Sequence, residues 1–171
     1  MKQVYYIMKA ELQSLFYSPI AWLILVVFTI QCSVAFCDTL DSVAKAVAEG
    51  QQMPGLTYWF FSRDYHGWGV FHAGMRYLYI YFPLLTMGLF SRELASGSIK
   101  LLDSSPVSTI QVVIGKFFSM LVYALVLLGV WMIFVIYGGI SIENFAYARI
   151  WVAFLGMFLT MATYSAIGLF M

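Results

Sequence analysis

The stretch FFSMLVYALVLLGVWMIFVIYGGISI, residues 117–142, contains no charged side chain. A bilayer has a hydrocarbon core about 30 Å thick, and an α-helix of about 20 apolar residues crosses it. This stretch is longer than that minimum, so it predicts a transmembrane helix with room to tilt. The segment therefore places the chain in a membrane.

The composition of the whole chain agrees with this prediction. Hydrophobic residues make up 63% of the 171 residues and charged residues 10%, whereas soluble domains contain about 45–50% and about 25%. A soluble globule of this size would expose many apolar side chains to water. The composition excludes an ordinary soluble enzyme and a disordered chain, and the net charge of +1 gives no basic surface for nucleic acid. Cys32 and Cys37 match no redox or zinc motif and are expected to be buried thiols.

Three further segments are candidates for membrane spans. Residues 19–37 and 150–171 are also uncharged. Residues 70–91 contain Arg76 near one end and Pro83 in the middle, where the proline removes a helix hydrogen bond and predicts a kink. The sequence therefore predicts an all-α membrane protein, a polytopic helical bundle with about four transmembrane helices.

Residues 2–17 precede the first of these spans and form an amphipathic pattern with a helical period. Apolar side chains, Tyr5 and Leu15 among them, fall on one arc, lysines and glutamines on the opposite arc, and Glu11 at the border. The pattern is typical of a helix in the membrane interface with its apolar face toward lipid. The alternative is that the first span starts earlier, but the charges of Lys9 and Glu11 argue against it. The Ser-Pro pair at residues 18–19 instead predicts that the first span starts at Pro19.

The loop between the first two spans, residues 38–69, falls into two parts. The first keeps apolar residues at helical spacing as far as Gly50, which suits the end of a helix, and Gly55 after a proline predicts a turn. The second is rich in aromatic residues, which is typical of an anchoring belt at the membrane interface, with a substrate-stacking surface as the alternative. These aromatic residues are Tyr58, Trp59, Phe60, Phe61, Tyr65, Trp68 and Phe71.

Motifs for catalysis or nucleotide binding are missing from the sequence. It contains no phosphate-binding loop, nucleophile elbow or H-E-x-x-H motif, so no catalytic, cofactor-binding or metal site is expected. Asp64, His66 and His72 lack a fourth zinc ligand and are expected to be surface side chains. Ion-coupled carriers usually carry ionisable residues in their spans. Since three of the four predicted spans have none, transport would need energy from a partner.

Residues 83–118, PLLTMGLFSRELASGSIKLLDSSPVSTIQVVIGKFF, carry the most informative pattern. Gly97 is expected to end the helical extension of the second span, and Ser98 to cap a short apolar helix. A helix of about six residues is marginal alone in water, so it needs a partner or the membrane surface. The third span is expected to start at Pro106 or, alternatively, at a capping box that begins with Ser108.

This stretch resembles the cytosolic coupling loop of the type-2 ATP-binding-cassette (ABC) permeases. The resemblance is to the branch that includes gliding-motility and copper-enzyme-maturation permeases. The matching positions are Pro83, Thr86, Met87, Glu93, Gly97, Leu101, Leu102, Pro106, Val107, Gly115 and Lys116. Ser98 stands where the family has threonine, and the sequence departs from the family at Gly88, where arginine is usual, and at Lys100, where glutamate is common.

The resemblance implies a single permease transmembrane domain over residues 1–171, which is not an enzyme and moves substrate by alternating access. A separate ATPase subunit is expected to bind ATP and Mg²⁺, and this chain no cofactor. The implied partners are that ATPase, a second permease subunit in a dimer, and the lipid bilayer. The implied partner-binding residues lie in or beside the coupling loop, residues 92–116: Glu93, Gly97, Ser98, Ile99, Leu101, Leu102 and Pro106.

The resemblance also implies a multi-pass protein of the bacterial plasma (inner) membrane with its N-terminus in the cytoplasm. That orientation places five of the nine lysine and arginine residues inside, which is a small excess. Family members usually have six spans, and the chain ends within apolar sequence at Met171, so it is expected to be a fragment or the product of a truncated gene. The alternative function is a non-transporting four-helix membrane anchor or assembly factor.

Overall fold

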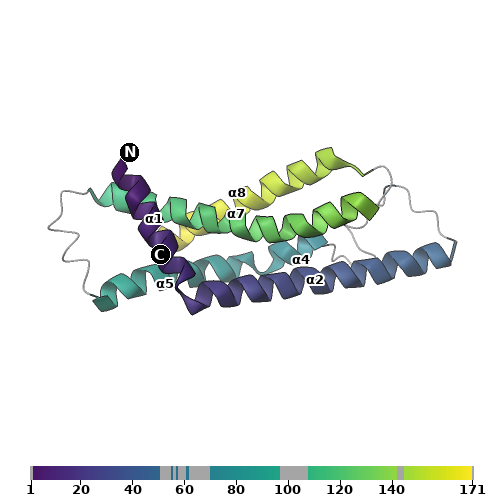
Figure 1. Cartoon of the computed structure of the whole chain (residues 1–171), viewed down its shortest axis with the longest axis horizontal. Coiled ribbons are helices and arrows are strands. Elements are labelled where there is room, and N and C mark those ends of the chain that lie inside the picture. Colours follow the sequence, from purple (N-terminus) through teal and green to yellow (C-terminus); the bar gives the residue numbers. More distant parts are fainter. Residues whose placement is uncertain are drawn as a thin grey trace. The chain divides into compact units, whose positions relative to one another are not determined.

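The computed structural model describes residues 2–50, 55, 57, 61, 70–96, 108–141 and 145–170. All regular secondary structure in this part of the chain is α-helical, without a strand, which confirms the predicted all-α membrane class. The helices are labelled in Figure 1. They are α1 (Lys2–Phe16), α2 (Pro19–Ala48), α4 (Val70–Arg76), α5 (Leu78–Ser96), α7 (Thr109–Ser141) and α8 (Tyr147–Phe170).

Three of the described helices are long and apolar enough to cross a bilayer. They are α2, α7 over Ile110–Ile140, and α8. They overlap the predicted spans at residues 19–37, 117–142 and 150–171, but α2 continues to Ala48 and α7 begins at Thr109. Ile142 and Met171 lie outside the described residues. The apolar runs of the sequence thus form long helices, as the length of a bilayer crossing requires.

The predicted second span, residues 70–91, is not one continuous helix. The chain forms α4, which has seven residues, and α5, with a turn at Tyr77 between them (Figure 1). Pro83 lies inside α5, so the interruption does not fall at the proline, where a kink was predicted. Proline leaves only the carbonyl of Tyr79 without its usual donor, and α5 continues past this defect. Neither α4 nor α5 alone is among the candidate spans, so a crossing by the two together stays a prediction.

Short sequence signals mark several of the observed helix ends. The helix α2 begins at Pro19, as the Ser-Pro pair predicts. It ends at Ala48, and Gly50 follows with a φ of 74°, a conformation that glycine adopts without steric strain. The helix α7 begins at Thr109, and the hydroxyl oxygen of Ser108 accepts a hydrogen bond from the backbone N–H of Gln111 at 3.4 Å. The capping signal at Ser108, the second of the two alternatives, therefore marks the start of α7.

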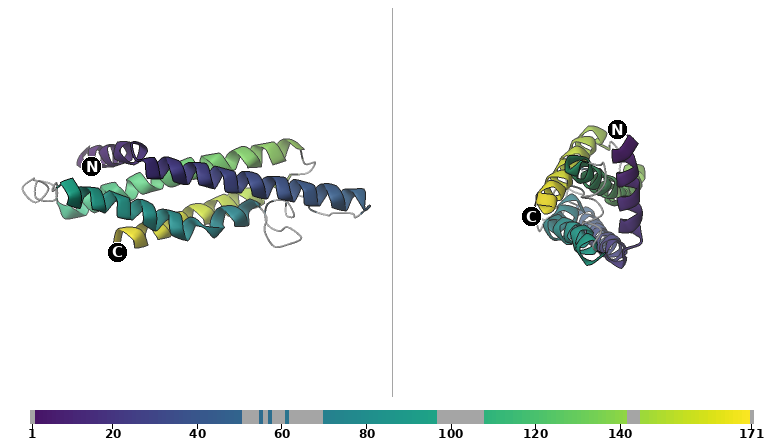
Figure 2. Two further views of the ribbon diagram at one scale, coloured as in Figure 1. Left: turned by 90° about the horizontal axis from the view of Figure 1, so that it is seen from below. Right: turned by 90° about the vertical axis from the view of Figure 1, so that its left-hand side faces the viewer.

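The chain divides into two compact units. Figure 2 shows the ribbon from two further directions, coloured along the sequence. Unit 1 consists of Met1–Ile24, Leu78–Val126 and Phe158–Met171, and unit 2 of Leu25–Tyr77 and Leu127–Met157. Accordingly α1 and α5 belong to unit 1 and α4 to unit 2, while α2, α7 and α8 contribute part of their length to each.

In unit 1, glycines allow pairs of helices to approach closely. A Cβ atom added to Gly115 of α7 would lie 2.6 Å from Cγ2 of Ile7 in α1. A Cβ atom added to Gly168 of α8 would overlap the side chain of Thr86 in α5. Lipid tails are as apolar as leucine, so helices in a membrane associate largely through such close van der Waals contacts.

In unit 2, aromatic side chains form the core. Trp131 of α7 is fully buried, and its ring centre lies 6.2 Å from that of Phe61 and 5.7 Å from that of Phe71. Phe61 also contacts Phe145, and a Cβ atom on Gly138 would lie 2.7 Å from its ring. The predicted interfacial belt is therefore wrong for Phe61, because the space left by Gly138 admits its ring into the core. Phe71 is half-buried, and the other five aromatic residues of the predicted belt lie outside the described residues.

The two cysteines lie in different environments. Cys32 is buried, as expected, but Cys37 is exposed, which corrects the prediction that both thiols are buried. Five residues along an α-helix amount to a rotation of about 140° beyond one full turn. The spacing therefore places the second cysteine on another face of α2.

Candidate functional site

The predicted partner-binding residues lie at or beyond the edge of the described structure. The structure does not describe residues 97–107, which contain Gly97, Ser98, Ile99, Leu101, Leu102 and Pro106. Glu93 lies in the last part of α5, and its side chain is outside the described structure. What the structure does describe is the two flanks of the coupling loop, since α5 continues to Ser96 and α7 begins at Thr109.

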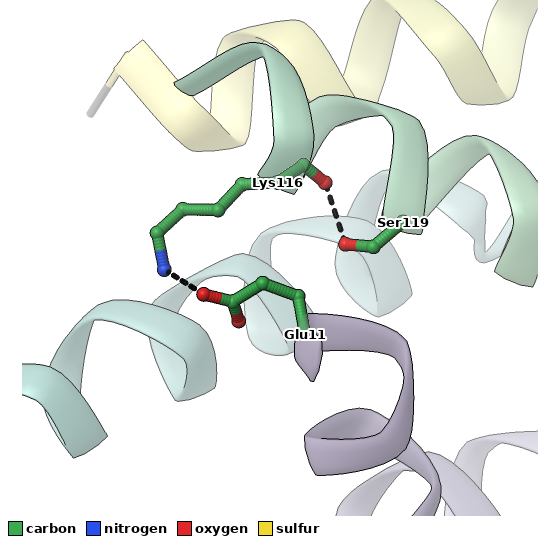
Figure 3. A network of polar contacts seen from close by, with 3 residues as sticks. All are labelled: Glu11, Lys116 and Ser119. Atoms are coloured by element: carbon green, nitrogen blue, oxygen red, sulfur yellow. Dashed lines mark hydrogen bonds and ion pairs between the residues drawn. The ribbon is translucent and has the colours of Figure 1, made fainter. Parts of the chain in front are cut away.

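A buried ion pair occupies the α7 flank (Figure 3). The ammonium nitrogen Nζ of Lys116 lies 2.8 Å from the carboxylate oxygen Oε1 of Glu11 in α1. The side chain of Lys116 is 1% exposed and that of Glu11 16%. One turn further along α7, the hydroxyl of Ser119 donates a hydrogen bond to the carbonyl oxygen of Lys116 at 2.7 Å. A buried ammonium group is unfavourable without a partner, and Glu11 supplies the compensating charge.

Close packing surrounds this ion pair on both sides. Towards the N-terminus of α1, Ile7 contacts Gly115, the residue directly before Lys116. Towards its C-terminus, the ring of Phe16 lies 6.2 Å from that of Tyr123 of α7. The hydroxyl of Tyr123 donates a hydrogen bond of 2.7 Å to the carbonyl oxygen of Ala21, near the start of α2. The contacts between α1 and α7 therefore extend from Ile7 to Phe16.

The structure places one residue of α1 differently from the amphipathic pattern. Glu11, expected at the border between the two faces, is directed at α7 and paired with Lys116. On the predicted apolar face, Tyr5 is exposed and Leu15 is buried. Part of the apolar face thus packs on protein. The predicted placement of α1 along the lipid interface stays a prediction.

Sequence reasoning did not find the ion pair. Lys116 matches the family pattern, and the charge of Glu11 argues against an early start of the first span, but neither observation links the two residues. A lysine close to the start of a long apolar run is a signal that a counter-charge is needed. Nothing in the sequence, however, indicates which acidic residue supplies it.

Two neighbouring family positions, Thr86 and Met87, have different surroundings. Thr86 is fully buried against Gly168, and its hydroxyl donates a hydrogen bond of 2.9 Å to the carbonyl oxygen of Pro83. Met87 is exposed. Thr86 is therefore a helix-packing residue, and the threonine of the family pattern has a structural explanation in this chain.

Among the described helices, three are long and apolar enough to cross a bilayer, which is the pattern of a multi-pass membrane protein. A family model for ABC-2 family transporter proteins matches residues 5–171. The chain belongs to this family, whose members are membrane permease components of ABC transporters. The match confirms the resemblance inferred from residues 83–118, while the particular branch stays a prediction. No curated protein and no solved structure shows a significant match.

Proposed function

We propose that this chain is the permease subunit that moves substrate across the membrane by alternating access, driven by a separate ATPase subunit. The family match over residues 5–171 carries the proposal. The sequence contains no phosphate-binding loop of its own. ATP and Mg²⁺ are therefore bound by the ATPase partner, and this chain supplies the membrane path.

The coupling loop is the contact through which the ATPase acts. Its short apolar segment, with Ile99, Leu101 and Leu102, binds a groove of the ATPase, and Glu93, Gly97, Ser98 and Pro106 shape or extend this contact. Closure of the ATPase on ATP displaces the loop together with its flanks, α5 and α7. The ATPase then favours one of two permease conformations, and this difference in binding free energy drives the change of access.

The assembly expected around this chain follows from the same proposal. Two permease subunits pair in the plasma membrane of a bacterium, and each contacts one ATPase in the cytoplasm. The N-terminus and the coupling loop lie on the cytoplasmic side. Residues 38–69 lie on the opposite side.

The test is purification of the native complex in a mild detergent. The chain, tagged at a terminus and expressed at its native level, is isolated from membranes, and the co-purifying proteins are identified by mass spectrometry. We expect a subunit with a phosphate-binding loop, and permease-dependent stimulation of its ATP hydrolysis after reconstitution in liposomes. An ATPase variant without the lysine of its phosphate-binding loop is the control. Recovery of the chain without any ATPase would overturn the proposal and favour a membrane anchor or assembly factor.

A further inference from the structure

We propose that Glu11 and Lys116 are a positioning pair that fixes the rotational register of α1 on α7. In this arrangement α1 and the first turns of α7 move as one body when the coupling loop is displaced. The role in transport rests on the proposed function. The register itself is a property of this chain and can be measured without the ATPase.

Burial of the pair indicates what it contributes. The side chain of Lys116 is almost wholly removed from solvent, and Glu11 is largely covered. Because desolvation of two charges offsets most of their attraction, a buried ion pair adds little net stability over apolar residues of similar volume. Its best-attested contribution is the selection of one register among several apolar alternatives. The flanking contact of Ile7 and the packing of Phe16 already hold the two helices together.

Two neighbouring contacts define a single register. On α1, Ile7 and Glu11 are four residues apart and therefore lie on the same face of the helix. On α7, their partners Gly115 and Lys116 are consecutive residues. Rotation of α1 by one residue, about 100°, would move the carboxylate of Glu11 away from Lys116. The same rotation would move Ile7 out of the space left by Gly115. The ion pair thus adds the cost of an unpaired buried charge to the loss of apolar packing between Ile7 and Gly115.

The position of the pair on α7 explains why the register matters for coupling. Lys116 lies two turns after Thr109, where α7 begins on leaving residues 97–107. A force on the coupling loop acts first on these turns. The ion pair transfers it to α1, and Tyr123 transfers it through its hydrogen bond with Ala21 to the start of α2. Without the ion pair, α1 would not be held in one register on α7, and the first turns of α7 would move without α1.

Cysteine cross-linking tests the register directly. Cys32 and Cys37 are first replaced by alanine, and Ile7→Cys and Gly115→Cys are then introduced as a pair. A Cβ atom at residue 115 would lie 3.0 Å from Cβ of Ile7, so a small shift reaches the separation of about 3.5–4.5 Å found in disulfides. We expect rapid cross-linking by a mild oxidant in native membranes. Its initial rate is the measured quantity.

Three further changes are then compared in this background. Lys116→Met leaves the carboxylate of Glu11 without its partner, and we expect the rate to fall by at least about tenfold. The double variant Glu11→Met with Lys116→Met preserves apolar volume and avoids an unpaired charge, so it folds even if the single variant does not, and a similar fall is expected. The exchange Glu11→Lys with Lys116→Glu restores most of the rate. The control is Lys9→Met, the same substitution at an exposed residue of α1, and it leaves the cross-linking rate unchanged.

The outcomes separate this inference from the proposed function. An unchanged cross-linking rate in the folded double variant would overturn the positioning role, whatever the ATPase does. In the reconstituted complex, the double variant without introduced cysteines should retain the ATPase and lose several-fold of the permease-dependent stimulation of ATP hydrolysis. A lower cross-linking rate with normal stimulation would overturn the role in coupling. Absence of any ATPase from the wild-type complex would overturn the proposed function and, with it, the role of the ion pair in transport. The cross-linking rate would still decide whether the pair fixes the register of α1 on α7.

Discussion

Thr86 and Gly168 bring α5 and α8 into direct contact within unit 1. A Cβ atom at residue 168 would overlap the threonine side chain, so the two helices approach to a distance that only glycine permits. Ser165, one turn earlier on α8, is also fully buried, and its hydroxyl donates a hydrogen bond to the carbonyl oxygen of Met161 at 2.8 Å. Ser165 and Gly168 of α8 thus both face the interior of the unit.

Substitution of Gly168 by valine should therefore separate α8 from α5. Excess volume at a tightly packed contact costs about 1–3 kcal/mol of unfolding free energy, and we expect a clearly lower thermal unfolding temperature in detergent. Gly156→Val, in the same helix, is the matched control because an added Cβ there meets nothing within 4 Å. Equal unfolding temperatures for the two variants would contradict the close contact.

Replacement of Phe61 by alanine should destabilise unit 2. Phe61 is 1% exposed and contacts Trp131, Phe145 and Gly138, and truncation of such a phenylalanine costs about 3–5 kcal/mol. Phe170→Ala removes the same ring from a residue that is 93% exposed and should have little effect on the unfolding temperature. If neither variant lowers the unfolding temperature appreciably, Phe61 is an interfacial anchor and not a core residue.

Local signals in the sequence predicted several of the helix ends. The start of α2 at Pro19, its termination before Gly50 and the cap at Ser108 each depend on a few adjacent residues whose backbone preferences are intrinsic. The long apolar runs depend only on the thickness of the bilayer. These features could be read from the sequence because no distant residue decides them.

Two of the features that sequence reasoning missed depend on distant residues. Glu11 lies on the border of its helical pattern, and only the position of Lys116, 105 residues later, turns it inward. Phe61 fits an interfacial belt until Gly138 opens space in the core. Tertiary contacts of this kind override local pattern. The predicted partner-binding residues other than Glu93 fall within residues 97–107, outside the described structure, so the roles of the whole set stay predictions.

The predicted topology gives a further test in sealed cells. With the N-terminus in the cytoplasm, residues 38–69 face outward and the coupling loop faces inward. In a background without Cys32 and Cys37, a membrane-impermeant maleimide should modify Ser62→Cys and spare Ser98→Cys. After permeabilisation both should react, which controls for reactivity. The opposite pattern in sealed cells would place the coupling loop on the wrong side for an ATPase.

The most direct measurement of the central claim is recovery of the ATPase with the Leu102→Glu variant. An ATPase groove that receives Leu102 would have to bury an unpaired carboxylate, and loss of one anchoring side chain alone costs about 2 kcal/mol or more, roughly a 30-fold weaker affinity. We predict loss of ATPase co-purification with normal expression and membrane insertion, since this residue is predicted to lie outside the bilayer. Gln51→Glu, in the loop on the opposite side, is the matched control and should retain the ATPase. Equal recovery with the wild type, Leu102→Glu and Gln51→Glu would contradict the coupling role.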